Sequence, residues 1–175
     1  LPQCAFRHGQ RFIQKDISSE GAKILVASSL LRDFFEKHHK VYLDTSAFIY
    51  FVEQHPRYYK FCEYIFENIE AGHMEASTSA LTLLEILVQP YKLKKEDIVL
   101  KFYSLFTSYP NIKWIDLNLG IADLAARFRA EYQLKTPDAI QIASAISCGA
   151  TAFICNDRVF QRIQGIECLV IDDFL

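Results

Sequence analysis

Four acidic residues occupy positions where a solvated protein surface would not ordinarily place them: Asp44, Glu85, Asp138 and Asp157. The first and the last follow short apolar runs, the second lies inside an apolar segment, and the third opens a helical pattern. A carboxylate in apolar surroundings is costly unless it is paired or bound to a metal, and neighbouring carboxylates repel one another. A divalent cation resolves both problems, and ligands that are all oxygen favour Mg²⁺ or Mn²⁺ over zinc.

Each acid alone also has an ordinary structural explanation. Asp44 and Asp157 could be turn or capping residues, and Asp138 suits the positive end of a helix dipole. Glu85 could pair with a lysine or arginine elsewhere in the chain. Coincidence explains all four together much less easily than any one of them, so we expect the four carboxylates to gather at one site.

The segments around these acids alternate between short apolar runs and amphipathic stretches. Strands are predicted over 41–43, 74–78, 112–117, 152–155 and 168–171; those over 41–43 and 152–155 are apolar enough to be buried, and the one over 74–78 is the weakest. The amphipathic stretches predict helices over 47–53, 58–71, 80–88, 95–109, 120–132, 136–148 and 157–163. This alternation indicates right-handed crossovers, a mainly parallel sheet and a three-layer α/β/α sandwich. Such sheets bind ligands beyond the carboxyl ends of their strands, and a parallel sheet can gather the acids there.

Capping residues and prolines are placed to begin and end these helices. Thr45 or Ser46 is expected to cap the helix that follows the first strand. Ser79 is expected to cap the helix over 80–88, and Pro90 is expected to end it. Thr136 is expected to cap the alanine-rich helix that carries the third acid.

The chain of 175 residues fits one domain with an appendage. We expect a catalytic domain over 40–175 and an N-terminal extension over 1–39, with a helix around 22–38. The apolar stripe of that helix favours packing on the main domain over a partner-facing role. His38 and His39 are adjacent, which makes a poor metal clamp, and we expect them at a solvated helix end.

Composition narrows the class of protein. A net charge of −2 is unlike a bulk nucleic-acid-binding domain, although a metal-filled acidic pocket would bring its own positive charge. Five cysteines, an odd number with no CxxC pair, predict reduced thiols and a cytoplasmic setting. No apolar run approaches the ~20 residues of a membrane helix, so we expect no membrane partner.

Four motifs carry a resemblance to a known family. They are Val41-Tyr42-Leu43-Asp44-Thr45-Ser46, Glu85 in its apolar helix, Thr136-Pro137-Asp138-Ala139-Ile140-Gln141-Ile142-Ala143, and Cys155-Asn156-Asp157-Arg158-Val159-Phe160. In order and spacing, over about residues 40–175, they resemble a PIN domain and are most similar to the ribonuclease toxins of the VapC type. The resemblance implies a Mg²⁺- or Mn²⁺-dependent endoribonuclease. It also implies a homodimer, inhibited by an antitoxin protein that inserts a peptide into the acidic groove.

The resemblance assigns catalytic and metal-binding roles to the four acids. Asp44, Asp138 and Asp157 would hold the metal. Glu85 would bind it through water or orient and deprotonate the attacking water. Two departures from the toxins are visible: Gln141 stands where histidine is frequent, and Cys155 stands where threonine or serine is common. Neither departure removes a metal ligand.

Five further residues are candidate contacts within the site or to the substrate. Thr45, Ser46 and Asn156 are expected as polar contacts of the site. Arg158 and Lys135, each close in sequence to a motif acid, are candidate contacts to RNA phosphates, although solvated charges are equally consistent with the sequence.

Two other functions compete with the nuclease. One is a catalytically idle PIN-like module that binds RNA or a protein partner. The other is a phosphatase or phosphotransferase with an acidic Mg²⁺ site, whose first aspartate would be followed two residues later by a second. That position is Ser46, which weakens this alternative.

Overall fold

The computed structural model describes residues 31–174. Within them, five strands form one wholly parallel sheet in the order β3-β2-β1-β4-β5. The strands are β1 (Lys40–Leu43), β2 (Glu75–Ser79), β3 (Ile112–Ile115), β4 (Ala152–Cys155) and β5 (Glu167–Val170). The α-helices are α2 (Thr45–Val52), α3 (Tyr59–Glu70), α4 (Ala80–Lys92), α5 (Glu96–Ser108), α6 (Leu119–Tyr132) and α7 (Thr136–Ser147). Two short 3-10 helices, η1 (Arg158–Arg162) and η2 (Ile171–Phe174), complete the described chain.

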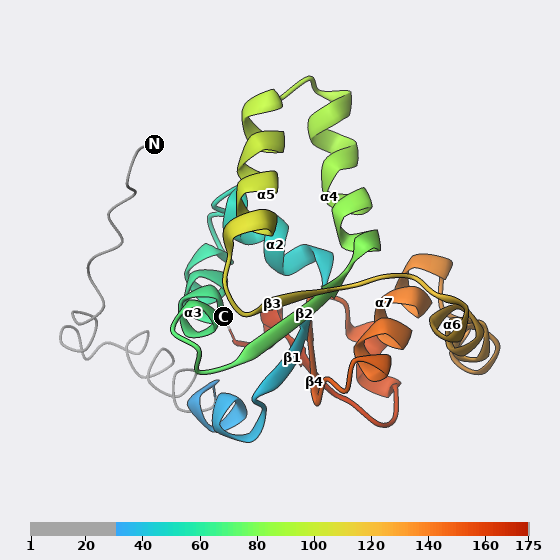
Figure 1. The fold of residues 1–175 in the computed structure, drawn as a ribbon. Helices are drawn as coiled ribbons and strands as arrows, with labels where there is room; N and C mark the ends of the chain where they lie inside the picture. The colour runs from blue at the N-terminus through green and yellow to red at the C-terminus, as the bar shows by residue number, and fades with distance from the viewer. Residues whose placement is uncertain (1–30, 175) are drawn as a thin grey trace.

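The sheet is covered on both faces, which confirms the predicted three-layer sandwich (Figure 1). Alternate residues of the central strands enter two separate cores. Val41 and Leu43 join one core with α2, α3 and α5, whereas Tyr42 joins the other with α6 and α7. Across β1 and β4, the Tyr42 and Phe153 rings stack with centroids 5.4 Å apart. Because β1 is buried on both faces, its short apolar run needs no polar alternation.

The strand order places a topological switch point beside β1. The chain proceeds from β1 through β2 to β3 on one side, and then continues with β4 and β5 on the other. β1 pairs with both β2 and β4, and Val41 lies opposite Ala152. Crossovers that diverge in this way open a crevice beyond the carboxyl ends of the two strands. The residues that follow β1 and β4 therefore line the preferred ligand-binding edge.

The residues just before β1 form a helix over 31–37 that packs on the main domain. Leu31, Phe34 and Phe35 are buried in the same core as α3. The prediction of a solvated helix end at His38 is wrong, because only 4% of this residue is exposed. Its Nδ1 lies 2.9 Å from Oγ1 of Thr151, and its Nε2 lies 3.1 Å from Oε2 of Glu167. The rest of the predicted 22–38 helix lies outside the described residues.

The hairpin of α4 and α5 stands out from the sheet (Figure 1). Contrary to prediction, Pro90 does not end α4, which continues to Lys92. Proline lacks one N–H, and therefore one helix hydrogen bond is missing, but Pro90 is buried and its carbonyl accepts from the backbone N–H of Lys95. Packing of α4 on α5 thus carries the helix past the proline.

The predicted caps need correction as well. Asp44 itself caps α2, so that helix begins with Thr45 and neither Thr45 nor Ser46 is the cap. Thr136 is the first residue of α7, and Lys135 is its cap. Ser79 does hold the capping position of α4, but its side chain makes no capping hydrogen bond. The hydroxyls of Thr45 and Ser79 make tertiary hydrogen bonds in place of capping bonds, to Glu85 and Gln141 respectively.

Two further sequence expectations can be compared with the described chain. Its four cysteines, Cys62, Cys148, Cys155 and Cys168, are all free thiols, as the odd count suggested. None of the helices in residues 31–174 is long and apolar enough to cross a membrane.

Candidate active site

Asp44 lies directly after β1, at the switch point of the sheet. As the cap of α2, its Oδ2 accepts hydrogen bonds from the backbone N–H of Ser46 at 3.4 Å and from Ser46 Oγ at 3.0 Å. Burial raises the pKa of this carboxyl to about 6, and the charge of Glu85 acts in the same direction. The bonds from Ser46 and the Thr45 backbone only partly oppose this effect. Asp44 is thus both a structural cap and a carboxylate that would gain from a cation.

Glu85 reaches the same edge from α4. Thr45 Oγ1 donates to Glu85 Oε2 at 2.5 Å, and Gln141 Nε2 donates to the same oxygen at 3.1 Å. These two bonds join α2, α4 and α7 around one carboxylate. The sequence suggested a lysine or arginine as the partner of Glu85, but both of these donors are neutral. They therefore do not neutralise the charge of Glu85.

Asp138 occupies the first turn of α7, as the sequence suggested. Its pKa is raised, first by burial, then by the charge of Asp157, and further by that of Glu85; Lys135 opposes these effects. Asp157 is exposed, and its Oδ1 caps η1 by accepting from the backbone N–H of Val159 at 2.9 Å. The ordinary capping explanation for Asp157 therefore holds alongside its candidate role.

Electrostatic interactions link all four acids at the carboxyl edge of the sheet: Asp44 to Glu85, Glu85 to Asp138, and Asp138 to Asp157. Their chemistry suits Mg²⁺ or Mn²⁺, because every donor is a carboxylate oxygen. In residues 31–174, however, no three histidine, cysteine or acidic side chains lie close enough to hold one metal ion together. The four acids form an electrostatically connected cluster and not a closed ligand cage.

Of the predicted polar contacts, Thr45 and Ser46 each bond one of the acids, but Asn156 has a different set of partners. Its Nδ2 donates to Tyr50 Oη at 3.0 Å, and its Oδ1 accepts from the backbone N–H of Asp172 at 2.9 Å. Asn156 therefore ties the segment after β4 to α2 and to η2. These bonds fix the backbone before Asp157, and the Asn156 amide makes no hydrogen bond to the four acids.

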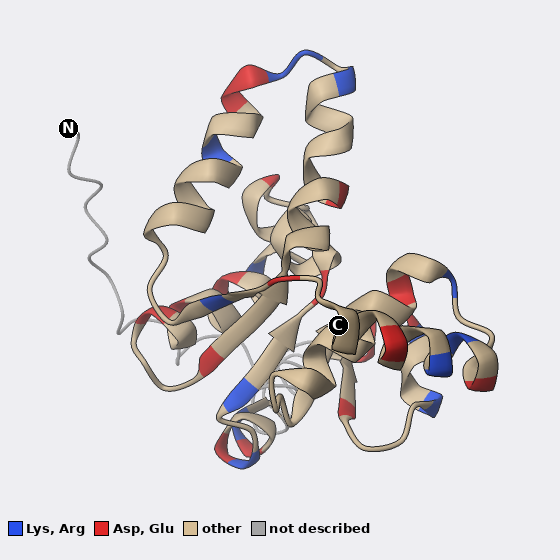
Figure 2. Cartoon of the chain, turned by 45° about the vertical axis from the view of Figure 1, so that its right-hand side comes forward, with Lys and Arg blue, Asp and Glu red and all other residues tan. Residues whose placement is uncertain are grey.

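The two predicted phosphate contacts differ in their surroundings. Arg158 is engaged in an ion pair with Asp173 of η2. Lys135 is exposed, and its charge acts on Asp138. Figure 2 shows basic and acidic residues interspersed on the part of the cartoon that carries α6 and α7. Lys135 is consequently the better placed of the two cations.

A buried polar network behind Glu85 was missed by the sequence reasoning, which treated Gln141 only as a departure from the toxins. Gln141, Thr82 and Ser79 are each at most 2% exposed, and both Thr82 and Ser79 are hydrogen-bonded to Gln141. The available signal was polar residues at buried positions: Gln141 interrupts the apolar, alanine-rich face of its helix, and Thr82 does the same in α4.

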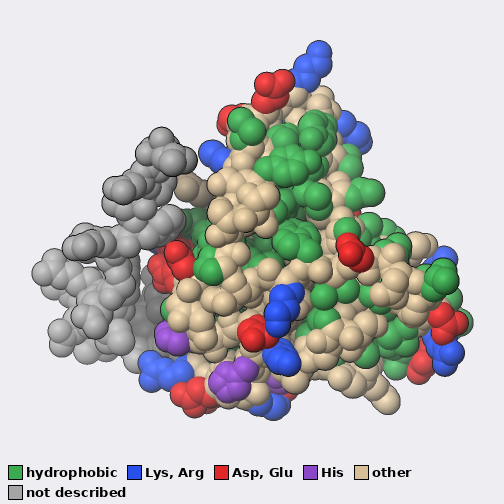
Figure 3. Space-filling model, viewed as in Figure 1, with side chains coloured by type: hydrophobic (Ala, Val, Ile, Leu, Met, Phe, Trp, Pro, Cys, Tyr) green, Lys and Arg blue, Asp and Glu red, His purple; other side chains and the backbone are tan. Residues whose placement is uncertain are grey.

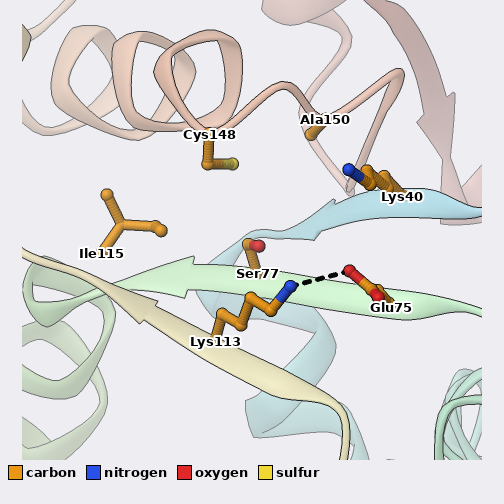
Figure 4. A pocket seen from close by; sticks show the side chains of 7 residues that line it. All are labelled: Lys40, Glu75, Ser77, Lys113, Ile115, Cys148 and Ala150. Atoms are coloured by element: carbon orange, nitrogen blue, oxygen red, sulfur yellow. Dashed lines mark hydrogen bonds and ion pairs between the residues drawn. The ribbon is translucent and has the colours of Figure 1, made fainter.

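A small cavity lies elsewhere, between the face of β1, β2 and β3 and the segment that follows α7 (Figure 4). It is lined by Lys40, Glu75, Ser77, Lys113, Ile115, Cys148 and Ala150. Lys113 Nζ and Glu75 Oε2 are 2.8 Å apart within it, so its one acidic residue is already paired. This cavity contains none of the four acids and is not the candidate active site.

Comparison with known proteins gives an independent measure of similarity. The family model described as PIN domain matches residues 41–166. A search of the curated proteins finds no match.

Three solved structures resemble the chain, and each match covers 75% of it. They are VapBC2 from Rickettsia felis bound to a DNA fragment from the promoter (22% identity, 98% of that chain, TM-score 0.59), a toxin–antitoxin complex from Klebsiella pneumoniae (22%, 97%, 0.56) and DNA-bound VapBC from Salmonella typhimurium (24%, 98%, 0.59). At these identities the likeness shows the fold.

Proposed function

Because this chain belongs to the PIN-domain family, we propose that it is a Mg²⁺- or Mn²⁺-dependent endoribonuclease and the toxin of a toxin–antitoxin pair. One observation carries the proposal. Asp44, Glu85 and Asp138 come from three separate elements to the switch-point edge, and their charges act on one another there. Raised carboxyl pKa values in such a crevice are typical of a functional site and not of a solvated surface.

In this proposal Asp44, Asp138 and Asp157 hold the cation, which when bound lowers the pKa of water and offsets charge that develops on the phosphate. Ser46 fixes the Asp44 carboxylate through two hydrogen bonds to Oδ2. The described hydrogen bonds of Glu85 fall on Oε2, which leaves Oε1 to accept a proton from the attacking water.

Lys135 is the proposed contact to RNA phosphates. It caps α7 three residues before Asp138, so a phosphate held there would lie beside the acidic cluster. Arg158 would first have to leave Asp173, and we therefore assign it a smaller role.

An exposed apolar surface on the α4–α5 hairpin supports a protein partner (Figure 3). Its residues are Leu84, Val88, Tyr91, Leu93, Leu100 and Tyr103, which are between 40% and 68% exposed. A contiguous apolar patch on an otherwise charged surface is typical of an interaction site. The similar solved structures include VapBC and toxin–antitoxin complexes, and we propose that an antitoxin protein or a second copy of this chain covers the hairpin.

One observation favours the second candidate function, a PIN-like module that binds RNA or a protein without catalysis. The described acids form no closed cage around a common point. Calorimetry discriminates between the two functions, because a nuclease of this kind binds Mn²⁺ at millimolar metal or below and an idle module does not.

The direct test is cleavage of RNA by the purified chain with Mn²⁺, with EDTA, and after Asp44→Asn. We expect cleavage only with the native sequence and metal. Glu75→Gln is the matched control, because Glu75 lies at the opposite edge of the sheet and pairs with Lys113. Cleavage that survives both EDTA and Asp44→Asn would overturn the proposed function.

A further inference from the structure

Gln141 lies in the middle of α7 and is almost completely buried, with 2% of its surface exposed. It follows Asp138 by three residues, so the two lie on the same side of the helix. Its Nε2 is 3.0 Å from Thr82 Oγ1, 3.1 Å from Glu85 Oε2 and 3.2 Å from Thr45 Oγ1, so its two hydrogens are shared among three acceptors. Gln141 therefore contacts the candidate catalytic glutamate from the interior of the protein.

The chemistry of its neighbours fixes the orientation of this carboxamide. An ionised carboxylate accepts hydrogen bonds but donates none, so the NH₂ group must face Glu85. On the other side, Oε1 of Gln141 accepts from Tyr42 Oη at 2.6 Å and from Ser79 Oγ at 3.0 Å. Burial raises the pKa of Tyr42 above its usual range, so its hydroxyl remains a donor. The amide is thus held at both ends.

Thr45 completes the arrangement around the carboxylate. Its single hydroxyl proton is donated to Glu85 Oε2, so Thr45 Oγ1 acts as an acceptor toward Gln141 Nε2. Two donors, from α2 and α7, converge on one oxygen of Glu85. A carboxylate held this way cannot rotate without breaking both bonds, and within residues 31–174 no fully buried side-chain nitrogen or oxygen lacks a partner.

We propose that Gln141 is a positioning residue for the reaction. It fixes Oε2 of Glu85, so that Oε1 is presented in one orientation as base or ligand, and the Tyr42–Ser79 pair keeps its amide from turning over. This inference rests on the proposed function, because a positioning role for Gln141 requires that Glu85 takes part in catalysis. The competing explanation is that Gln141 merely satisfies buried hydroxyl groups and affects activity only through stability.

A double-mutant cycle separates the two explanations. Gln141→Met keeps the length of the side chain and removes both ends of the amide. We expect kcat in single-turnover RNA cleavage to fall about tenfold, the equivalent of one hydrogen bond to a charged group. KM should stay within about twofold, because a group that acts only in the transition state leaves substrate binding unchanged. In a Glu85→Gln background, the same substitution should change kcat no further.

Mn²⁺ binding, measured by calorimetry, gives a readout that does not depend on turnover. Because the charge of Glu85 acts on two of the acids proposed to hold the cation, Gln141→Met should weaken Mn²⁺ binding about threefold in the native background. It should leave binding unchanged beside Glu85→Gln, the non-additivity expected of residues in contact. Tyr42→Phe removes one donor that holds the amide and touches Glu85 nowhere. It should lower kcat by a smaller factor, about threefold, and this effect should also vanish beside Glu85→Gln.

Ile142→Val is the matched control, because it removes a buried methylene group from the same helix without touching the polar network. It should lower the unfolding midpoint and leave kcat unchanged. Equal losses of kcat from Gln141→Met in both backgrounds would overturn the positioning role while metal-dependent cleavage by the native chain upholds the proposed function. A native chain that neither binds Mn²⁺ nor cleaves RNA overturns both.

Discussion

Acidic residues lie at both edges of the sheet, but their surroundings are opposite. At the amino-terminal edge, Glu75 pairs with Lys113, and Glu167 pairs with Lys37 and contacts His38. The pKa of each of these two carboxyls is lowered, chiefly by its lysine partner.

At the carboxyl-terminal edge, burial and neighbouring carboxylates raise the pKa of Asp44 and Asp138. The hydrogen-bond donors to these two carboxylates are neutral groups. Among the interactions that lower either pKa, only that with Lys135 involves a positive charge. One edge is therefore electrostatically satisfied by the chain itself, whereas the other accumulates negative charge that a cation could neutralise. The position of an acid in a parallel sheet is therefore less informative about function than whether the chain supplies its counter-charge.

The largest effect expected from this difference between the edges is on catalysis. Asp138→Asn keeps the size of the side chain and removes one charge from the acidic cluster. We expect kcat for RNA cleavage to fall by about 10²-fold or more, the loss typical of removing one preorganised electrostatic contact. Single-turnover assays at saturating Mn²⁺ measure it. Glu167→Gln, which removes a charge at the opposite edge, should leave kcat unchanged; equal losses from the two variants would contradict the functional distinction between the edges.

The largest effect on stability is expected at the amino-terminal edge. His38→Ala removes a buried ring that packs on Phe34 with centroids 4.6 Å apart and contacts Thr151 and Glu167. We expect the free energy of unfolding to fall by about 2–3 kcal/mol, because packing and buried hydrogen bonds are lost together. Urea denaturation measures the loss. The folded variant should retain the native kcat, and a large drop in kcat below the unfolding range would contradict this division of roles.

Removal of the charge of Asp44 should raise the free energy of unfolding, unlike the loss of His38. The folded-state pKa of about 6 lies above the ordinary value of 3.8, so the fold loses stability as pH rises from about 4 through about 6. In EDTA at pH 7, Asp44→Asn should therefore raise the free energy of unfolding by about 1–2 kcal/mol, less than the full shift implies because the side chain keeps some solvent contact. Below about pH 4 the gain should disappear, since Asp44 is then neutral in both states. A gain that persists at pH 4 would show that its charge is not the cause.

The fold was largely predictable because its signals are local. Val41–Leu43 and the other apolar runs are too short for helices, and the amphipathic stretches between them are long enough to cross over the sheet. The errors arose where tertiary contacts replaced local ones. Thr45 bonds Glu85 in place of a helix end, and Pro90 lies within a helix that packing sustains.

The candidate site was predictable only in part. Three of its acids could be placed because strand ends and helix starts of a parallel sheet meet at one edge. The partners of those acids could not, because they depend on strand order. Gln141 and Thr45 are separated by 96 positions in the chain and meet only because β1 lies at the centre of the sheet. Nothing in the local pattern around either residue encodes that meeting.

The smallest predicted effect is a change in the free energy of unfolding, and it has opposite signs at the two edges of the sheet. Glu167→Gln removes a half-exposed carboxylate that pairs with Lys37 and contacts His38, so we expect a cost of at most about 1 kcal/mol at pH 7. Its folded pKa is lowered, so its stabilising effect is present above the unfolded pKa and is lost as pH falls through the folded one. Urea titrations of both variants in EDTA, from pH 7 downward, should show the gain of Asp44→Asn shrinking between about pH 6 and pH 4. The cost of Glu167→Gln should persist over that range and shrink only below the ordinary carboxyl pKa of 4.5. Since the two effects have opposite signs, a uniform acid-induced loss of structure cannot produce both, and only the difference in counter-charge between the edges accounts for them.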